Sequence, residues 1–227
     1  MKKLFVLMAI LLFVSFAKLY AQTVVKGRVL FDGTPPPVEK VEVKSDIPTC
    51  GSSKEVRKII LGAEGGVANA VVKIIGAAGT TEPGKGTLDQ VQCEFVPHVQ
   101  VLPVGSALTI TSSDSVLHNS HGFYEDGSTA FNIAVPIVGM EVTQKLNKVG
   151  MLKLRCDAGH TWMNAYIMVS DTPHYALTDT NGNFSLGGVP IGQYEIEVWQ
   201  EWLGVHRESL IVKEGETAPV LIHLQKT

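Results

Sequence analysis

Three side chains that bind soft metal ions occur within eight positions of the chain. They are Cys156, His160 and Met163, in the segment CDAGHTWM, and an apolar, β-prone run follows directly. A cysteine ligand binds a metal as the thiolate, and thiolate and thioether donors prefer soft ions such as Cu(I). The segment therefore predicts a soft-metal site on a loop between two strands. The alternative is that the three side chains are neighbours in an ordinary core.

A second imidazole is available about forty residues upstream. Blue-copper sites combine two imidazoles and one thiolate in a plane with a weak axial Met. The segment SDSVLHNSHGF supplies His118, which closes a predicted strand and is followed by Asn119. A strand end that faces the cysteine loop would complete the donor set.

These segments together resemble the cupredoxins. The stretch FVPHVQVLPVGSALTITSSDSVLHN is similar to their pattern of F-x-P, strand, V-x-x-G, strand, N/S-x-D and His-Asn, and C-x3-H-x2-M is similar to their ligand loop. The resemblance covers roughly residues 90 to 170. It implies that the residue after the first histidine, Asn119, holds the ligand loops together by a hydrogen bond. It also implies one copper ion with four ligands: His118, Cys156, His160 and Met163.

The ligand spacing limits the number of metal ions. C-x3-H is longer than the C-x2-H of the shortest cupredoxins, and it equals the spacing in part of the binuclear copper centre of respiratory oxidases. That centre needs another cysteine four residues before Cys156, where this chain has Leu152. One copper is therefore expected. Zinc fits less well because methionine is rarely a zinc ligand.

Other residues near these motifs are predicted to support the ligands and not to bind the metal themselves. His98 and His121 are expected beside the ligands; the alternatives are a second metal site or ordinary strand positions. Trp162 lies between two predicted ligands and is expected to shield the metal from water or to pack on a neighbouring module. The carboxylates near the first histidine read as turn residues: Asp114, Glu125 and Asp126.

The cysteine count agrees with this assignment. An exported protein with three cysteines leaves one unpaired. If Cys156 binds copper, Cys50 and Cys93 can form a disulfide in an oxidising compartment. The alternative is two buried thiols.

The N-terminus predicts export. Residues 1–21 have two lysines directly after Met1, then an apolar run, and a small residue before the expected cut, as in a secretory signal peptide. The apolar run is short for a membrane span, so no stable span is expected after cleavage. The expected location is the periplasm or the outside of the cell.

The charge of the chain argues against a nucleic-acid partner. It has 19 Lys and Arg against 22 Asp and Glu, a net charge of −3, which becomes −6 once the three lysines of the signal are removed. There is no basic stripe and no alternation of aromatic and basic residues.

Hydrophobic periodicity predicts an all-β chain. Short alternating runs separated by Gly, Pro and Asn turns are typical of β-sandwich or barrel modules. Residues 89–170 are predicted to form a cupredoxin Greek-key sandwich or barrel. Residues 171–227, with TDTNGNFSLGGVPIGQYEIEVW, resemble the carboxypeptidase-regulatory, transthyretin-like sandwich. Strands in residues 22–88 are shared between the two modules in a way that the sequence does not assign.

The leading functional interpretation is an exported electron carrier that cycles one copper between Cu(I) and Cu(II), with redox partner proteins of the cell envelope. The alternatives are a copper-binding or delivery protein without a redox partner and a structural sandwich with a vestigial site. Catalysis needs an open coordination position or a second cofactor, and the sequence indicates neither. The chain is therefore predicted not to be an enzyme.

Overall fold

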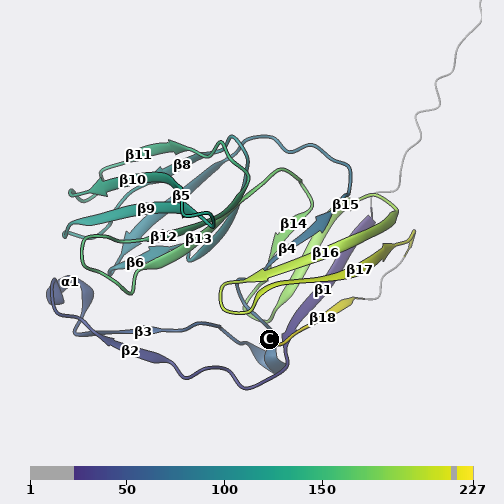
Figure 1. Cartoon of the computed structure of the whole chain (residues 1–227), viewed down its shortest axis with the longest axis horizontal. Coiled ribbons are helices and arrows are strands. Elements are labelled where there is room, and N and C mark those ends of the chain that lie inside the picture. Colours follow the sequence, from purple (N-terminus) through teal and green to yellow (C-terminus); the bar gives the residue numbers. More distant parts are fainter. Residues whose placement is uncertain (1–22, 216–218, 227) are drawn as a thin grey trace, which may run out of the picture.

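The computed structural model describes residues 23–215 and 219–226, and the predicted signal peptide, residues 1–21, lies outside them. The described chain is almost entirely β-strand, which confirms the predicted all-β class. Two β-sandwiches lie side by side, and a long hairpin arm runs beneath them in the view of Figure 1. Within the described part of the chain, no helix is long and apolar enough to cross a membrane.

The first sandwich contains two sheets around one apolar core. Their strand orders are β10-β9-β12-β13-β7 and β11-β8-β5-β6. Inward positions are apolar and outward positions polar; in β12, Leu152 and Leu154 are buried and Lys153 is exposed. The strands are β5 (Lys85–Val91), β6 (Glu94–Val96), β7 (Val99–Pro103), β8 (Ala107–Ile110), β9 (His118–Tyr124), β10 (Thr129–Val135), β11 (Val142–Lys145), β12 (Gly150–Arg155) and β13 (Asn164–Ser170).

The second sandwich draws strands from both ends of the chain. Its sheets have the orders β15-β1-β18 and β14-β4-β16-β17, and a second apolar core lies between them. A short 3-10 turn, η1 (Ala63–Gly65), precedes β4. The strands are β1 (Thr23–Phe31), β4 (Val71–Ile75), β14 (Tyr175–Leu177), β15 (Asn183–Val189), β16 (Gly192–Gln200), β17 (Gly204–Val212) and β18 (Val220–Leu224).

Residues 22–88, unassigned by the sequence, are divided three ways. β1 and β4 are central strands of the second sandwich, and β5 belongs to the first. β1 alternates buried and less buried residues because its inner face packs against the second core, while its edges bond β15 and β18. The first sandwich is therefore inserted between β4 and β14 of the second.

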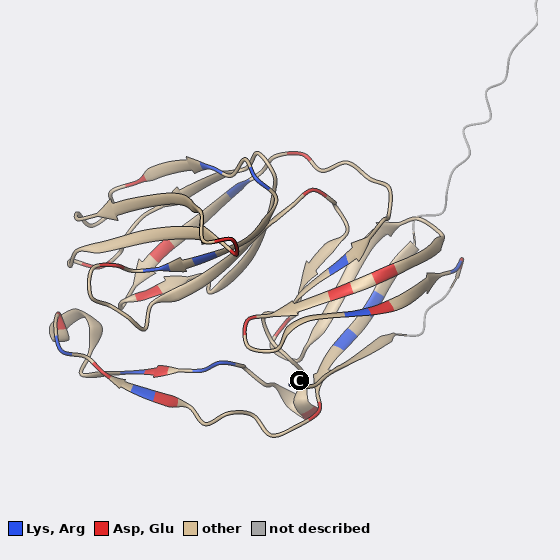
Figure 2. Ribbon diagram, in the orientation of Figure 1, with Lys and Arg blue, Asp and Glu red and all other residues tan. Residues whose placement is uncertain are grey.

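Residues 32–58, which follow β1, form the arm. It consists of β2 (Glu39–Glu42), a single helical turn α1 (Ile47–Cys50) and β3 (Ser53–Val56). β2 and β3 pair with each other and carry charges of both signs, as Figure 2 shows. Near the tip, Val43 and Cys50 are buried in the core of the first sandwich. The arm is therefore fixed at its tip, far from the strand where it begins.

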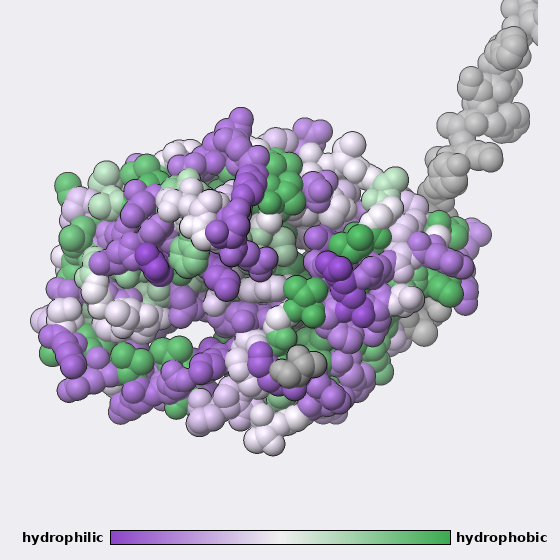
Figure 3. Space-filling view, viewed as in Figure 1, coloured by the Kyte–Doolittle hydropathy of each residue, from purple (hydrophilic) through white to green (hydrophobic). Residues whose placement is uncertain are grey.

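The strands of the arm lie less closely against the first sandwich than its tip does. A pocket of about 290 Å³ lies behind β3, and Figure 3 shows this side of the molecule hollowed above the arm. The pocket is lined by Lys54, Arg57, Glu94, His98, Trp162 and Met163, among others. One ion pair crosses beside it, between Lys54 and Glu94 at 3.2 Å.

A small apolar cluster joins the two sandwiches. It contains Val71 and Trp199 from the second sandwich and Val99, Met151 and Met168 from the first. Beside it, the His98 ring and the Glu201 carboxylate are 2.9 Å apart. The sandwiches are thus in direct contact as well as joined by the chain.

Candidate metal centre

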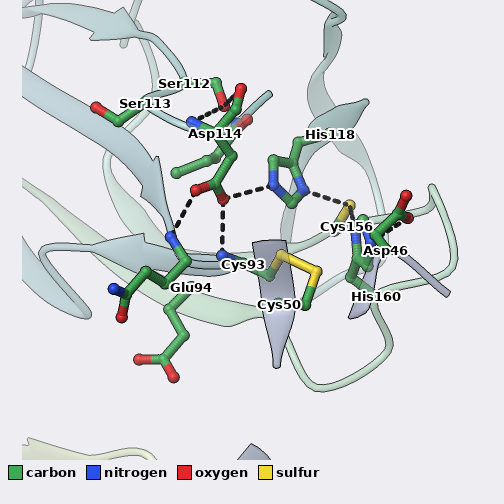
Figure 4. Close-up of polar contacts among 12 residues, drawn as sticks. Asp46, Cys50, Cys93, Glu94, Ser112, Ser113, Asp114, His118, Cys156 and His160 are labelled. Carbon is green, nitrogen blue, oxygen red and sulfur yellow. Dashed lines mark hydrogen bonds and ion pairs between the residues drawn. A yellow bond between two sulfur atoms is a disulfide. The ribbon is translucent and has the colours of Figure 1, made fainter. Parts of the chain in front are cut away.

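Three metal-binding side chains converge at one end of the first sandwich. The thiol sulfur of Cys156 lies 3.9 Å from Nδ1 of His118 and 3.6 Å from Nδ1 of His160. One ligand atom from each residue lies within 4.8 Å of the others. Both imidazoles are fully buried and the thiol is 5 % exposed. Figure 4 shows the two rings on either side of the cysteine.

The pairing of β9 with β12 brings these residues together. The two strands are antiparallel, with Arg155 opposite His121. The start of β9, at His118, therefore lies beside the end of β12, which Cys156 follows. His160 comes from the loop between β12 and β13, which turns back across the same end of the sandwich.

Each imidazole is oriented by a carboxylate on its other nitrogen. Asp114 lies 2.8 Å from Nε2 of His118, and Asp46 lies 3.1 Å from Nε2 of His160. A carboxylate that accepts the Nε2–H selects the tautomer in which Nδ1 has a free lone pair. Both Nδ1 lone pairs then face the cysteine, as metal binding requires.

Asp114 is itself held firmly. It is 6 % exposed, and its two oxygens accept hydrogen bonds from the backbone N–H groups of Gln92 and Cys93 at 2.7 Å each. The expectation that Asp114 is only a turn residue is incomplete, because it connects the His118 end of β9 to the segment that contains Cys93. Its spacing to His118, four residues, was the available sequence signal.

Asp46 is a residue of the candidate centre that the sequence did not indicate. It lies on the arm, 114 positions before His160, and its backbone is in the left-handed region with a φ of 56°. Only the folded arm brings the two together. No local motif could have predicted this contact.

Burial affects the protonation of the first imidazole. Desolvation lowers the pKa of His118 below its ordinary value, although the hydrogen bond that the ring donates to Asp114 acts in the opposite direction. A lowered pKa keeps the ring neutral near pH 7, and only the neutral imidazole can donate a lone pair to a metal.

Met163 lies on the same loop as His160. Its backbone N–H donates to the His160 carbonyl at 2.9 Å, and its side chain is 2 % exposed within the apolar cluster that includes Cys156. Its role as a fourth ligand stays a prediction. Trp162 covers the site from one side: its ring centroid is 5.4 Å from that of His160, and its indole N–H donates to the Cys93 carbonyl at 2.9 Å.

Asn119 joins the two ligand-bearing segments. Its side-chain oxygen accepts a hydrogen bond at 2.7 Å from the backbone N–H of Asp157, the residue after Cys156, and its side-chain amide donates to Asn132. The start of β9 is therefore tied to the beginning of the ligand loop.

The other two predicted histidines lie apart from the three converging side chains. His121 is on the outer face of β9, where its ring nitrogens contact Asp157 at 2.7 Å and Thr129 at 3.1 Å. His98 lies between the sandwiches, beside Glu201 and the Asn164 carbonyl. Their positions fit structural roles outside the donor set.

Cys50 and Cys93 form a disulfide, 43 residues apart in the chain. It fixes the tip of the arm to the turn before β6, and Figure 4 shows it below His118 and beside His160. Cys156 is left as the one free cysteine among the described residues, and it is buried.

Comparisons with known proteins found similarity only among solved structures. No protein-family model matches the chain, and no curated protein matches it significantly. A purple cupredoxin from Nitrosopumilus maritimus is 23% identical over 37% of this chain and 99% of its own, with a TM-score of 0.33. A reduced amicyanin mutant is 13% identical over 44% of this chain and 98% of its own, with a TM-score of 0.34.

A copper-containing nitrite reductase from Thermus scotoductus is also similar. It is 21% identical over 43% of this chain but only 25% of its own, with a TM-score of 0.33. These matches cover less than half of the chain and are distant. The assignment of a metal therefore depends on the donor geometry and not on these likenesses.

The donor set fits copper. Two imidazole nitrogens and a thiolate are the donors of a trigonal copper site, and both Nδ1 atoms already face the sulfur. The second nitrogen of each ring is satisfied by a carboxylate, so a metal would leave no buried N–H group without a partner. His118, Cys156 and His160 would hold the ion.

Proposed function

We propose that the chain is an exported copper protein that carries single electrons. The observation that supports this most strongly is the buried convergence of His118, Cys156 and His160 with both Nδ1 atoms aimed at the thiol. Copper bound there would supply one-electron chemistry by cycling between Cu(I) and Cu(II). Met163 is proposed as a weak fourth ligand, and the partners as redox proteins of the cell envelope.

The surrounding residues suit electron transfer because they hold the ligands still. Asp114 and Asp46 fix the two rings, and Asn119 fixes the loop after Cys156. A site whose ligands are held in one arrangement moves little when its charge changes, so little reorganisation opposes the transfer. Burial keeps water away from the donor atoms.

The same burial favours holding a metal over delivering it. His160 is completely covered, with the arm contributing Asp46 to its environment. A delivery site needs a ligand that the receiving protein can reach. We propose that residues 89–170 form the copper module, and that the transthyretin-like module has a structural or interaction role and no catalytic function.

The first test is titration of the metal-free protein with Cu(II). We expect one equivalent to produce an intense visible band, because the Cys156 thiolate transfers charge to Cu(II), and a reversible reduction potential. Cys156→Ser should lose the band while circular dichroism and melting temperature change little, because serine is close to cysteine in size and its hydroxyl can donate to an imidazole Nδ1 that already faces this position.

Two results would contradict the proposal. A band that persists in Cys156→Ser would show that another group is the thiolate donor. Tight Cu(I) binding without a stable coloured Cu(II) form would identify a copper-handling protein instead. The matched control is Asp157→Asn, which should keep the visible band. It changes the residue directly after Cys156, at a carboxylate that contacts His121 and Arg155.

A further inference from the structure

The disulfide lies close to both histidines of the candidate centre. The sulfurs of Cys50 and Cys93 and a ring nitrogen of His160 lie within 4.8 Å of one another. Cys93 also lies within 4.8 Å of Asp114 and of a ring nitrogen of His118. The sulfurs of a disulfide are poor ligands, whereas the thiolates formed by its reduction bind soft metals strongly.

We propose that reduction of the Cys50–Cys93 disulfide creates a second, thiolate-rich site for Cu(I), made of Cys50, Cys93 and His160. Cysteine thiolates select Cu(I), and the imidazole supplies a third donor. His160 belongs to both donor sets. The oxidised protein thus offers one thiolate beside this histidine, that of Cys156, and the reduced protein offers three.

The anchoring of the two cysteines supports the second site. The backbone N–H of Cys93 bonds to Asp114 and its carbonyl accepts from Trp162, so this residue stays in place when the sulfur bond breaks. Cys50 is buried with Val43 in the same core. Both thiols therefore remain near His160 after reduction.

A reductant can reach the bond if the arm moves. Cys50 and Cys93 are 3 % and 0 % exposed, so the closed structure protects them. However, β2 and β3 of the arm have no fully buried side chain, and a pocket of about 290 Å³ lies behind the arm. Segments with few buried contacts open at low free-energy cost.

The chemistry balances with a dithiol protein as the reductant. Two thiols of that protein are oxidised to its own disulfide, and their two hydrogens and two electrons convert the Cys50–Cys93 bond into two thiols. Binding of Cu(I) then releases the thiol protons to solvent. When the disulfide form of such a dithiol protein reoxidises Cys50 and Cys93, the two thiolates are lost as ligands and Cu(I) is released.

The test uses full-length mature Cys156→Ala protein, whose only cysteines are Cys50 and Cys93. A water-soluble phosphine performs the reduction: phosphorus takes the oxygen of water and becomes a phosphine oxide, and each sulfur gains a hydrogen. Cu(I) itself is the probe, in competition with a coloured Cu(I) chelator. The control is Cys156→Ala with Cys50→Ser and Cys93→Ser.

We expect reduced Cys156→Ala to bind one Cu(I) at least about tenfold more tightly than the oxidised form and than the control, with an ultraviolet thiolate-to-copper band. Adding His160→Ala should weaken binding by about tenfold or more. Equal affinities in the reduced and oxidised forms would overturn the proposal. An affinity unchanged by His160→Ala would also overturn it. That result would mean that reduction releases the arm and that the two thiols bind Cu(I) without the histidine.

These results are separable from the test of the Cys156 centre. That centre is measured on oxidised protein with Cu(II) and a visible band, and the second site on reduced Cys156→Ala with Cu(I). Either site can fail while the other is found.

Discussion

At the scale of single residues, the candidate centre combines groups of two kinds. Cys156 and His160 were predictable because their types and spacing are local, and His118 because it closes a predicted strand and precedes Asn119. Asp114 was identified only as a turn residue, and Asp46 was missed, because a carboxylate has no ligand signature of its own. What decides their roles is the distance to an imidazole nitrogen, 2.8 Å and 3.1 Å, which only the fold sets.

Replacing Asp46 with Asn should raise the reduction potential. The carboxylate makes His160 a stronger donor and adds negative charge, both of which favour Cu(II). We expect a rise on the order of tens of millivolts, since tenfold in relative affinity is about 59 mV for one electron. Voltammetry measures it. Glu42→Gln, an exposed carboxylate on the same arm, should leave the potential unchanged; an equal shift in both variants would exclude a local effect.

Met163→Leu tests the fourth ligand. Leucine roughly conserves the volume of methionine, so the buried loop should still pack, at a cost below about 1.5 kcal/mol in unfolding free energy. Copper and the visible band should be retained, while the potential rises because an axial donor that favours Cu(II) is gone. The potential and the melting temperature are measured together. An unchanged potential would make Met163 a core residue only.

At the scale of elements, the alternation of apolar and polar residues predicted the strands but not their partners. β1 and β4 were recognisable as strands, yet β1 pairs with β15 more than 150 residues later. A strand pattern defines which face is buried and contains no information on a partner so distant in sequence. The division of residues 22–88 therefore appeared only in the folded chain.

A fragment of residues 171–227 should not fold alone. β4 lies between β14 and β16 in one sheet, so without it these two strands have no link. β1 lies between β15 and β18 in the other sheet, and the same holds there. Far-ultraviolet circular dichroism should show an unfolded chain.

The control for this fragment retains both N-terminal strands. Residues 80–172 are replaced by a short Gly-Ser linker and Cys50 by Ser. This chain should fold, because β4 and β14 are antiparallel neighbours that a short loop can join. A folded 171–227 fragment would contradict the requirement for β1 and β4.

At the scale of the whole molecule, the contact between sandwiches should depend on pH. Burial lowers the pKa of His98, but the hydrogen bond and charge of Glu201 outweigh it, so the net pKa is raised. A raised pKa in the folded state stabilises the protein fully below the unfolded value of 6.5, and this stability is lost as pH rises through the folded value.

We expect His98→Gln to remove stability on the order of 1 kcal/mol at about pH 5.5 and much less at about pH 9. Urea unfolding of the metal-free proteins at both pH values measures the difference. A loss that is equal at the two values would mean that His98 contributes by packing and not by its charge.

The insertion of one sandwich into the other, together with the Cys50–Cys93 bond, determines how the molecule responds to cleavage. The sandwiches are joined through residues 76–84, through residues 171–174, and through the arm and its disulfide. A protease that cuts one connection leaves the other two intact. With both polypeptide connections cut, the chain would be in three pieces. On a denaturing non-reducing gel the N-terminal piece and the inserted sandwich would migrate as one species and separate only after a thiol is added, whereas the C-terminal piece, which has no cysteine, would migrate alone. The arm therefore ties the inserted sandwich covalently to the N-terminal strands.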